Sequence, residues 1–181
     1  GGSQAIAQTT TATPVASNNA TYTLTINGKD AAYKADASAT VAEITAGLLA
    51  AVQELTDAEW AEVTTTDETT LVQMVAVTAG KTFSASGTAS AGSLTVSTTV
   101  NSKGPNHWDD AENWSGGAVP VSTDTVNFEN LSIDYLYGID QNAVTLTALN
   151  IAASYTGNIG LPNYGQYSEY REKYLKIGAT T

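Results

Sequence analysis

The residues best suited to chemistry lie in one stretch, "NHWDDAENWSGGAVPVSTDTVNF", at positions 106–128 of this 181-residue chain. It contains the only histidine, His107, and close behind it Asp109, Asp110 and Glu112. Such groups could bind a metal ion or transfer protons, but a metal site needs about three convergent ligands, and one histidine beside carboxylates is an unspecific signal. We therefore expect His107 to be a solvated loop histidine, and we predict no catalytic and no metal-ligating residue here.

Other forms of catalysis find little support in the sequence. The chain has no cysteine and no G-x-S-x-G motif, so it lacks a thiol nucleophile and the usual serine turn. A pair of carboxylates could cleave a glycosidic bond, but sequence spacing cannot place two of them across a cleft. The sequence contains no D-x-D-x-D-G loop of the kind that binds calcium. We predict turn and strand-end positions for these carboxylates, and a protein that is not an enzyme and uses no cofactor. The acidic residues concerned are Asp109, Asp110, Glu112, Asp124, Glu129, Asp134 and Asp140.

The charge balance and the hydropathy pattern argue against two classes of partner. Lys and Arg number 7 against 18 Asp and Glu, for a net charge of −11, whereas a nucleic-acid backbone requires a basic surface. No run approaches the roughly 18 to 20 apolar residues of a membrane span. We therefore expect neither a nucleic acid nor a membrane as partner.

The first hundred residues predict an arm followed by a small domain. Residues 1–20 are rich in Thr, Ala and Ser without helical periodicity, which predicts an extended N-terminal anchoring arm that only a partner would order. In residues 21–100 the alternation of Tyr22, Leu24 and Ile26 with threonines, ending at Asn27-Gly28, is typical of a hairpin.

A helix is expected to cover the inner face of that hairpin, which would make residues 21–100 a small α+β domain. Thr40 and Glu43 form a T-x-x-E capping box in front of an apolar stripe. The residues of the stripe are Val41, Ile44, Leu48, Val52 and Leu55.

Residues 101–181 predict a β-rich unit of the solenoid or sandwich kind, so that the whole chain is mainly β with one helix. Its short apolar segments are separated by Gly, Asn and Pro, and we expect Leu146, Leu149 and Ile151 to point inward. Since the chain lacks an initiating Met and ends with the strand-like "KYLKIGATT", we expect it to be part of a longer protein.

The opening stretch is interpreted as a structural cap on the end of this β unit. Two indoles can close an otherwise open core, a Gly-Gly pair permits a tight reversal and a proline stiffens the exit. Val126 and Phe128 would then enter the first strand facing inward. The predicted cap consists of Trp108, Trp114, Gly116, Gly117 and Pro120.

A tyrosine run near the C-terminus leaves two interpretations open. Tyr164, Tyr167, Tyr170 and Tyr174 recur every three to four residues. Aromatic rings at this spacing could form a platform for sugars, but they equally suit packing, which we favour.

The chain also resembles a known family. The motif W-x5-W-S-G-G-x-V-P-x3-D-x-V-x-F resembles the entry motif that precedes β-helical regions in bacterial and phage surface proteins. Together with "GGSQAIAQ", "TYTLTINGKDAAY", "YLYGIDQ" and "YREKYLKIGATT", it makes nearly the whole chain similar to a family of tailed-bacteriophage virion proteins. The resemblance implies a β-helix that extends past the "LKIGATT" segment.

These observations lead to the expectation of a capsid decoration protein or head fibre at the surface of the virion. Ala5, Ile6, Ala7 and Gln8 of the arm would bind the shell by main-chain pairing. The expected partner is the major capsid protein or another virion protein, and a homo-oligomer is expected, with the trimer common among fibres. Two alternatives stay open: a tail-fibre or cell-surface adhesin that binds host glycans, and a depolymerase.

Overall fold

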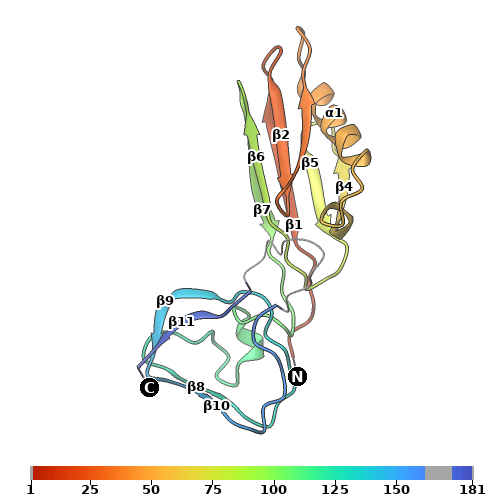
Figure 1. Ribbon diagram of the computed structural model, residues 1–181. Helices are drawn as coiled ribbons and strands as arrows, with labels where there is room; N and C mark the ends of the chain where they lie inside the picture. The colour runs from red at the N-terminus through yellow and green to blue at the C-terminus, as the bar shows by residue number, and fades with distance from the viewer. Residues whose placement is uncertain (1, 162–172, 181) are drawn as a thin grey trace. The chain divides into compact units, whose positions relative to one another are not determined.

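The computed structural model describes residues 2–161 and 173–180, which form two compact units (Figure 1). We call Ala7–Ser102 the two-sheet unit. The ladder unit combines residues 2–6 with the described residues from Lys103 onward. The chain thus passes between the units twice, and the predicted boundary between residues 20 and 21 is wrong, because residues 7–20 belong to the same unit as those that follow them.

The two-sheet unit contains seven antiparallel strands, one α-helix and one short 3-10 helix among its residues. One sheet has the order β4-β5-β1-β7 and the other β3-β2-β6. In chain order the elements are β1 (Thr9–Val15), β2 (Thr21–Ile26), β3 (Lys29–Lys34), α1 (Val41–Gln53), η1 (Trp60–Glu62), β4 (Val63–Asp67), β5 (Val72–Ala76), β6 (Ala85–Ala89) and β7 (Ser93–Val100).

The predicted hairpin is confirmed. Strands β2 and β3 pair in register from Thr21 opposite Lys34 to Ile26 opposite Lys29. Asn27 and Gly28 both have positive φ, 53° and 80°, as the tight turn between two twisted strands requires.

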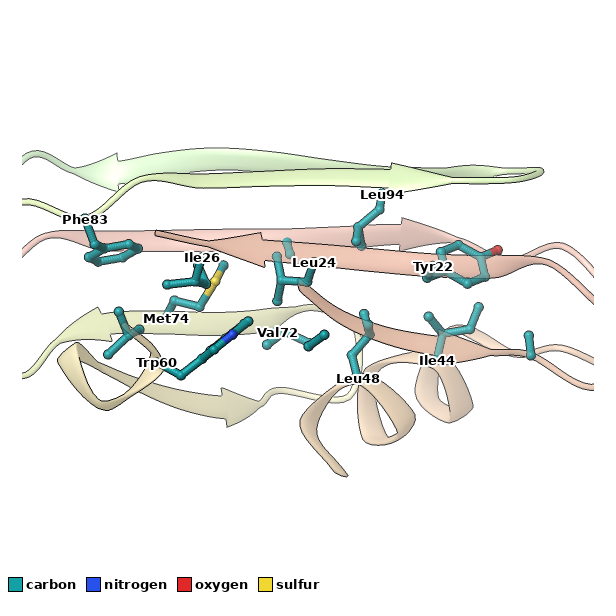
Figure 2. Packing of buried hydrophobic residues seen from close by; sticks show 14 of the residues in the cluster. Tyr22, Leu24, Ile26, Ile44, Leu48, Trp60, Val72, Met74, Phe83 and Leu94 are labelled. Carbon is teal, nitrogen blue, oxygen red and sulfur yellow. The ribbon is translucent and has the colours of Figure 1, made fainter. Parts of the chain in front are cut away.

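The core lies between the two sheets, where alternate side chains of their strands meet (Figure 2). From one sheet Tyr22 and Leu24 are fully buried, and from the other Val72 and Met74 are fully buried. Figure 2 shows the helix residues Ile44 and Leu48 completing the same cluster. The α+β prediction was therefore incomplete, because a second sheet, rather than the helix alone, covers the inner face of the hairpin.

Helix α1 contacts both β3 and β4, the outer strands of the two sheets. Its predicted capping box is present: the Thr40 side chain accepts from the Glu43 N–H, and the Glu43 side chain accepts from the Thr40 N–H. Glu43 also accepts a 2.6 Å hydrogen bond from the Tyr33 hydroxyl, and this bond is the main reason that the pKa of Tyr33 rises to about 12. One carboxylate thus joins the start of the helix to the strand it covers.

Strand β1 overturns the prediction of a free arm over residues 1–20. It lies inside its sheet, between β5 and β7, and pairs with β7 along its whole length. Its pairing with β5 extends only from Thr9 to Ala12, so Pro14, which has no N–H to donate, lies beyond that ladder. Thr10 and Ala12 are fully buried. A strand that donates and accepts on both edges is part of the fold, and a partner is not needed to order it.

The ladder unit is built from short parallel pairs. Its elements are η2 (Ala111–Asn113), β8 (Thr125–Phe128), β9 (Asp140–Leu146), β10 (Ala148–Ile151) and β11 (Lys176–Ala179). Strand β8 pairs with β10 and β9 pairs with β11, both in parallel, and isolated parallel bridges join Tyr135 to Ile159 and His107 to Tyr137. The described part of the chain is thus mainly β with one α-helix, as predicted.

Three of these pairings follow one another along the chain in the same order on both sides. The sequence β8, Tyr135, β9 is followed by β10, Ile159, β11, and each member of the first series pairs with its counterpart in the second. Thr125 lies opposite Ala148, a separation of 23 residues, and Tyr135 lies opposite Ile159, a separation of 24. In the third pairing Ala179 lies opposite Leu146, a separation of 33 residues, so the chain makes two passages of unequal length that pair in parallel.

The three residues predicted to point inward differ in their burial. Leu146 is fully buried and Leu149 packs against the same cluster, but Ile151 is 57% exposed. It lies in register with buried Phe128, and among the described strands β10 has no second neighbour that would cover it. Burial of Ile151 was thus predicted wrongly, because β10 is an outer strand.

Candidate functional site

The predicted cap forms an aromatic cluster in the ladder unit. Trp108 is fully buried, and its ring lies edge-on to Trp114 at a centroid distance of 4.8 Å. Trp114 stacks on Tyr135 at 5.4 Å and 28°, and Phe128 lies within 6.1 Å of both indoles. The Trp114 Nε1–H donates to the Trp108 carbonyl oxygen at 2.7 Å, which fixes the ring. Such tilted and offset arrangements are the favourable ones for aromatic rings, so the cluster is a packed core.

The remaining cap residues build the exit of this segment. Gly117 has a φ of 67°, and its N–H donates to the Trp114 carbonyl oxygen at 2.9 Å, so the chain reverses directly after the indole. Gly116 and Gly117 are exposed, whereas Pro120 is buried. The structure thus brings the two tryptophans together as one core element, while the Gly-Gly pair forms an exposed turn beside it.

His107 is not the solvated histidine that was predicted. Only 2% of it is exposed, and its Nδ1 lies 3.1 Å from Asp109 Oδ1. Its ring contacts the Tyr137 ring at 5.2 Å, and the two residues form a parallel bridge. His107 is buried because the ladder begins at this residue, which sequence spacing could not reveal.

Asn113 and Asp110 hold the N-terminal residues to the cap, and sequence reasoning did not anticipate this role. Asn113 Oδ1 accepts from the Ser3 N–H at 3.2 Å, and its Nδ2 donates to the carbonyl oxygens of Gly104 and His107, both at 2.8 Å. Asp110 Oδ2 accepts from the Ser3 hydroxyl. Residues 2–6 are therefore part of the ladder unit.

Asp110 is only 3% exposed, yet the pKa of its carboxyl group is lowered. Burial is the largest influence and by itself raises the pKa of Asp110, but the Ser3 hydroxyl and the Glu112 N–H donate to the carboxylate and lower it. The positive charge of Lys103 and the Gly104 N–H add to the lowering, so the net pKa lies below the ordinary value.

The Ser3→Ala variant should raise the pKa of Asp110 and destabilise the ladder unit by about 1–2 kcal/mol at neutral pH. A carboxylate of lowered pKa stabilises the fold above its unfolded pKa, and this contribution is lost as the pH falls through the folded pKa. The effect of Ser3→Ala should therefore shrink in acid. Urea unfolding at neutral and acidic pH, with NMR titration of Asp110, measures it. An equal effect of Ser3→Ala in an Asp110→Asn background would contradict the assignment.

The four predicted capsid-binding residues are divided between the units. Ala5 and Ile6 are exposed, and Ile6 bridges Lys103 through its N–H at 2.9 Å. Ala7 is half-buried. Gln8 is 5% exposed, and its side chain accepts from the Phe83 N–H at 3.1 Å and donates to the Phe83 carbonyl oxygen at 2.9 Å. The prediction that Gln8 binds the capsid is therefore wrong, because its amide makes hydrogen bonds inside the two-sheet unit.

Three of the other carboxylates have structural partners, and the tyrosine run is only partly described. Asp124 accepts from the Val121 N–H at 2.9 Å, Asp134 from the Asn158 N–H at 2.7 Å, and Asp140 lies 3.6 Å from Lys176 Nζ. These are the turn and strand-end roles that the sequence predicted. Three tyrosines, Tyr164, Tyr167 and Tyr170, lie outside the described residues. Tyr174 is 74% exposed, so its predicted packing is wrong.

Two adjoining clefts of the ladder unit were not anticipated. They measure about 410 and 570 Å³ and share Trp114, Ser115 and Asn127 in their linings. The larger is lined by the consecutive residues 124–127. Successive side chains of a strand point to opposite faces, so a cleft that reaches each of them lies along the edge of β8. The sequence signal for it was weak: a short strand that follows the Gly-Gly turn after seven further residues.

Comparison of the chain with protein-family models finds no match, and comparison with curated proteins finds no significant one either. Within residues 2–161 and 173–180, no group of three or more His, Cys, Asp or Glu residues could hold a metal ion. No helix in these ranges is long and apolar enough to span a bilayer.

Proposed function

We propose that this chain is a structural protein of a tailed-bacteriophage particle, a capsid decoration protein or head fibre, and that it is not an enzyme. Within this proposal the ladder unit is the capped start of a β-helix. The protein acts at the capsid surface as a homo-oligomer, and its partner is the major capsid protein or another virion protein.

One observation carries the proposal: the two stacked passages of the ladder unit. Parallel pairing of β8 with β10, Tyr135 with Ile159 and β9 with β11 is the hydrogen-bonding pattern that successive coils of a solenoid use. The cluster that these segments enclose includes Val126, Phe128 and Leu146. Each coil of a solenoid contacts only its neighbours, so added coils lengthen the structure along one axis. Such an elongated form suits a projecting virion component.

Polar side chains between the passages add to this support. Asn150 Nδ2 donates to Asn127 Oδ1 at 2.8 Å, and these residues lie opposite each other in β10 and β8. Stacked amides of this kind satisfy one another from coil to coil. The aromatic cluster at Trp108 then serves as the terminal cap that a stacked β structure needs.

The manner of anchoring has to differ from the sequence-based expectation. Only Ala5 and Ile6 of the four predicted contacts are exposed, whereas Gln8 and strand β1 belong to the fold. A free arm of twenty residues is therefore no part of the proposal. The exposed residues at the start of the chain remain candidates for shell contacts.

Mass spectrometry of purified particles of the phage that encodes this chain tests the proposal. Particles are separated into heads and tails, and the protein is quantified against the major capsid protein. We expect it in the head fraction in a fixed ratio to the capsid protein. Its presence in tails alone would favour the adhesin alternative, and its absence from both fractions would refute a virion role.

A further inference from the structure

Strand β8 offers a free edge to the two clefts of the ladder unit. In the described part of the chain its sheet contains two strands, β10 and β8, so β8 has one hydrogen-bonded edge. The clefts follow this strand from residue 124 to residue 129. An unpaired strand edge presents a row of N–H and C=O groups that another extended chain can pair with.

The orientation of the backbone tells which groups face the clefts. The Phe128 carbonyl oxygen accepts from the Ala152 N–H at 2.9 Å, and the Asp124 carbonyl oxygen accepts from the Thr147 N–H at 2.8 Å. Even-numbered residues of β8 therefore direct their main chain toward the β10 side. Because successive residues alternate, Thr125 and Asn127 direct theirs the other way, toward the clefts.

The walls of the clefts determine which ligand they suit. Beyond the β8 edge, the smaller cleft has apolar walls, with Leu131 39% and Ile133 37% exposed beside Tyr135. Among the described residues, the charged side chains that line the two clefts are Glu112, Asp124 and Glu129, and none is a Lys or Arg. A ligand that fits must satisfy main-chain groups, place apolar side chains and carry no negative charge.

We propose that the edge of β8 receives an extended, neutral-to-basic peptide segment of a partner protein by strand addition. Main-chain hydrogen bonds to Thr125 and Asn127 supply affinity, and alternate side chains of the peptide pack against the apolar walls of the smaller cleft. Its basic residues meet the three carboxylates, which gives charge complementarity. This inference concerns the groove alone and stands whether or not the chain is a virion component.

A saccharide is the less suitable ligand for the same groove. Sugars bind to the open face of an aromatic ring, but Trp114 has ring contacts with Trp108, Phe128 and Tyr135, and its N–H already donates to the Trp108 carbonyl oxygen. The Asn127 side chain accepts from Asn150.

Selection from a displayed library of random nine-residue peptides against the full chain supplies the probe. The tightest binder is synthesised in two forms. In one form the amide nitrogens of the odd-numbered peptide residues are methylated, and in the other those of the even-numbered residues. We expect one form to lose at least about 30-fold in affinity and the other to stay within about threefold, because strand addition uses only every second amide. In NMR, the peptide should slow hydrogen exchange of the Thr125 and Asn127 amides.

Charge variants give a matched control. Glu112→Gln and Glu129→Gln remove exposed carboxylates of the groove and should each weaken a basic peptide by roughly threefold. Glu68→Gln, at an exposed position of the two-sheet unit, should leave binding unchanged. The proposal is overturned if no selected peptide binds below about 100 µM, if both methylated forms bind alike, or if a glycan array yields binders that protect the groove while peptides do not.

Discussion

Removal of residues 1–16 should leave the two-sheet unit unfolded. The deletion takes away β1, which pairs with β5 on one edge and with β7 on the other. It also exposes the buried faces of both neighbours and leaves Phe83 without the Gln8 side chain that bonds its N–H and C=O. The loss exceeds the roughly 5–15 kcal/mol by which a domain of this size is stable. Circular dichroism and NMR amide dispersion measure the result.

A shorter deletion separates this effect from the loss of the N-terminus as such. Removing residues 1–6 should leave the two-sheet unit folded, because these residues belong to the ladder unit. The single variant Gln8→Ala should cost about 2–4 kcal/mol, since two buried backbone groups of Phe83 lose their partner. A folded two-sheet unit after removal of residues 1–16 would show that β1 is dispensable and would restore the free-arm interpretation.

Trp108→Ala should destabilise the ladder unit by about 3–5 kcal/mol, the usual cost of truncating a large buried aromatic side chain. Trp108 is fully buried and contacts the rings of Trp114, Phe128 and Tyr135. Its removal leaves a cavity at the centre of the cluster, which four-residue strands cannot close. Near-ultraviolet circular dichroism follows the aromatic packing, and urea unfolding gives the free energy.

Two further variants make this result specific. Trp108→Phe should cost much less, because the Trp108 Nε1 has no hydrogen-bond partner among the described residues and the ring contacts are partly kept. Tyr174→Ala, at a position that is 74% exposed, should change the free energy of unfolding by less than about 0.5 kcal/mol. A loss below about 1 kcal/mol for Trp108→Ala would refute the role of the cluster as a packed core.

The first prediction changes how shell binding has to be tested. A truncated chain that lacks residues 1–16 and fails to join particles would report unfolding as much as lost docking. Substitutions at Ala5 and Ile6 avoid this difficulty, because both side chains are exposed. Reduced incorporation of an Ile6→Asp variant with an unchanged unfolding curve would assign docking to this part of the chain.

Several elements could be predicted from the sequence because their signals are local. The alternation of Tyr22, Leu24 and Ile26 places one face of a strand in a core, and Asn27-Gly28 accepts the positive φ of the turn that follows. The box of Thr40 and Glu43 starts a helix through bonds within four residues. In each case the residues that decide the structure are also neighbours in the chain.

Strand β1 could not be predicted because its buried side chains are small. Thr10 and Ala12 have no apolar pattern to display, yet they are fully buried between strands that lie some sixty to ninety residues further on. Small side chains allow the opposite sheet with its larger residues to approach. A sequence of this composition is disordered by itself, and only partners distant in the chain give it order.

What the sequence determined by itself is a mainly β chain with one capped helix, a hairpin and an aromatic segment that serves packing. The tertiary structure alone decided that residues 7–20 lie inside the first unit, that His107 and Asp110 are buried, and that the edge of β8 lies open along two clefts. The physical reason is the range of the interactions. Turns and caps act over a few residues, whereas burial and strand pairing depend on segments that meet only when the chain has folded.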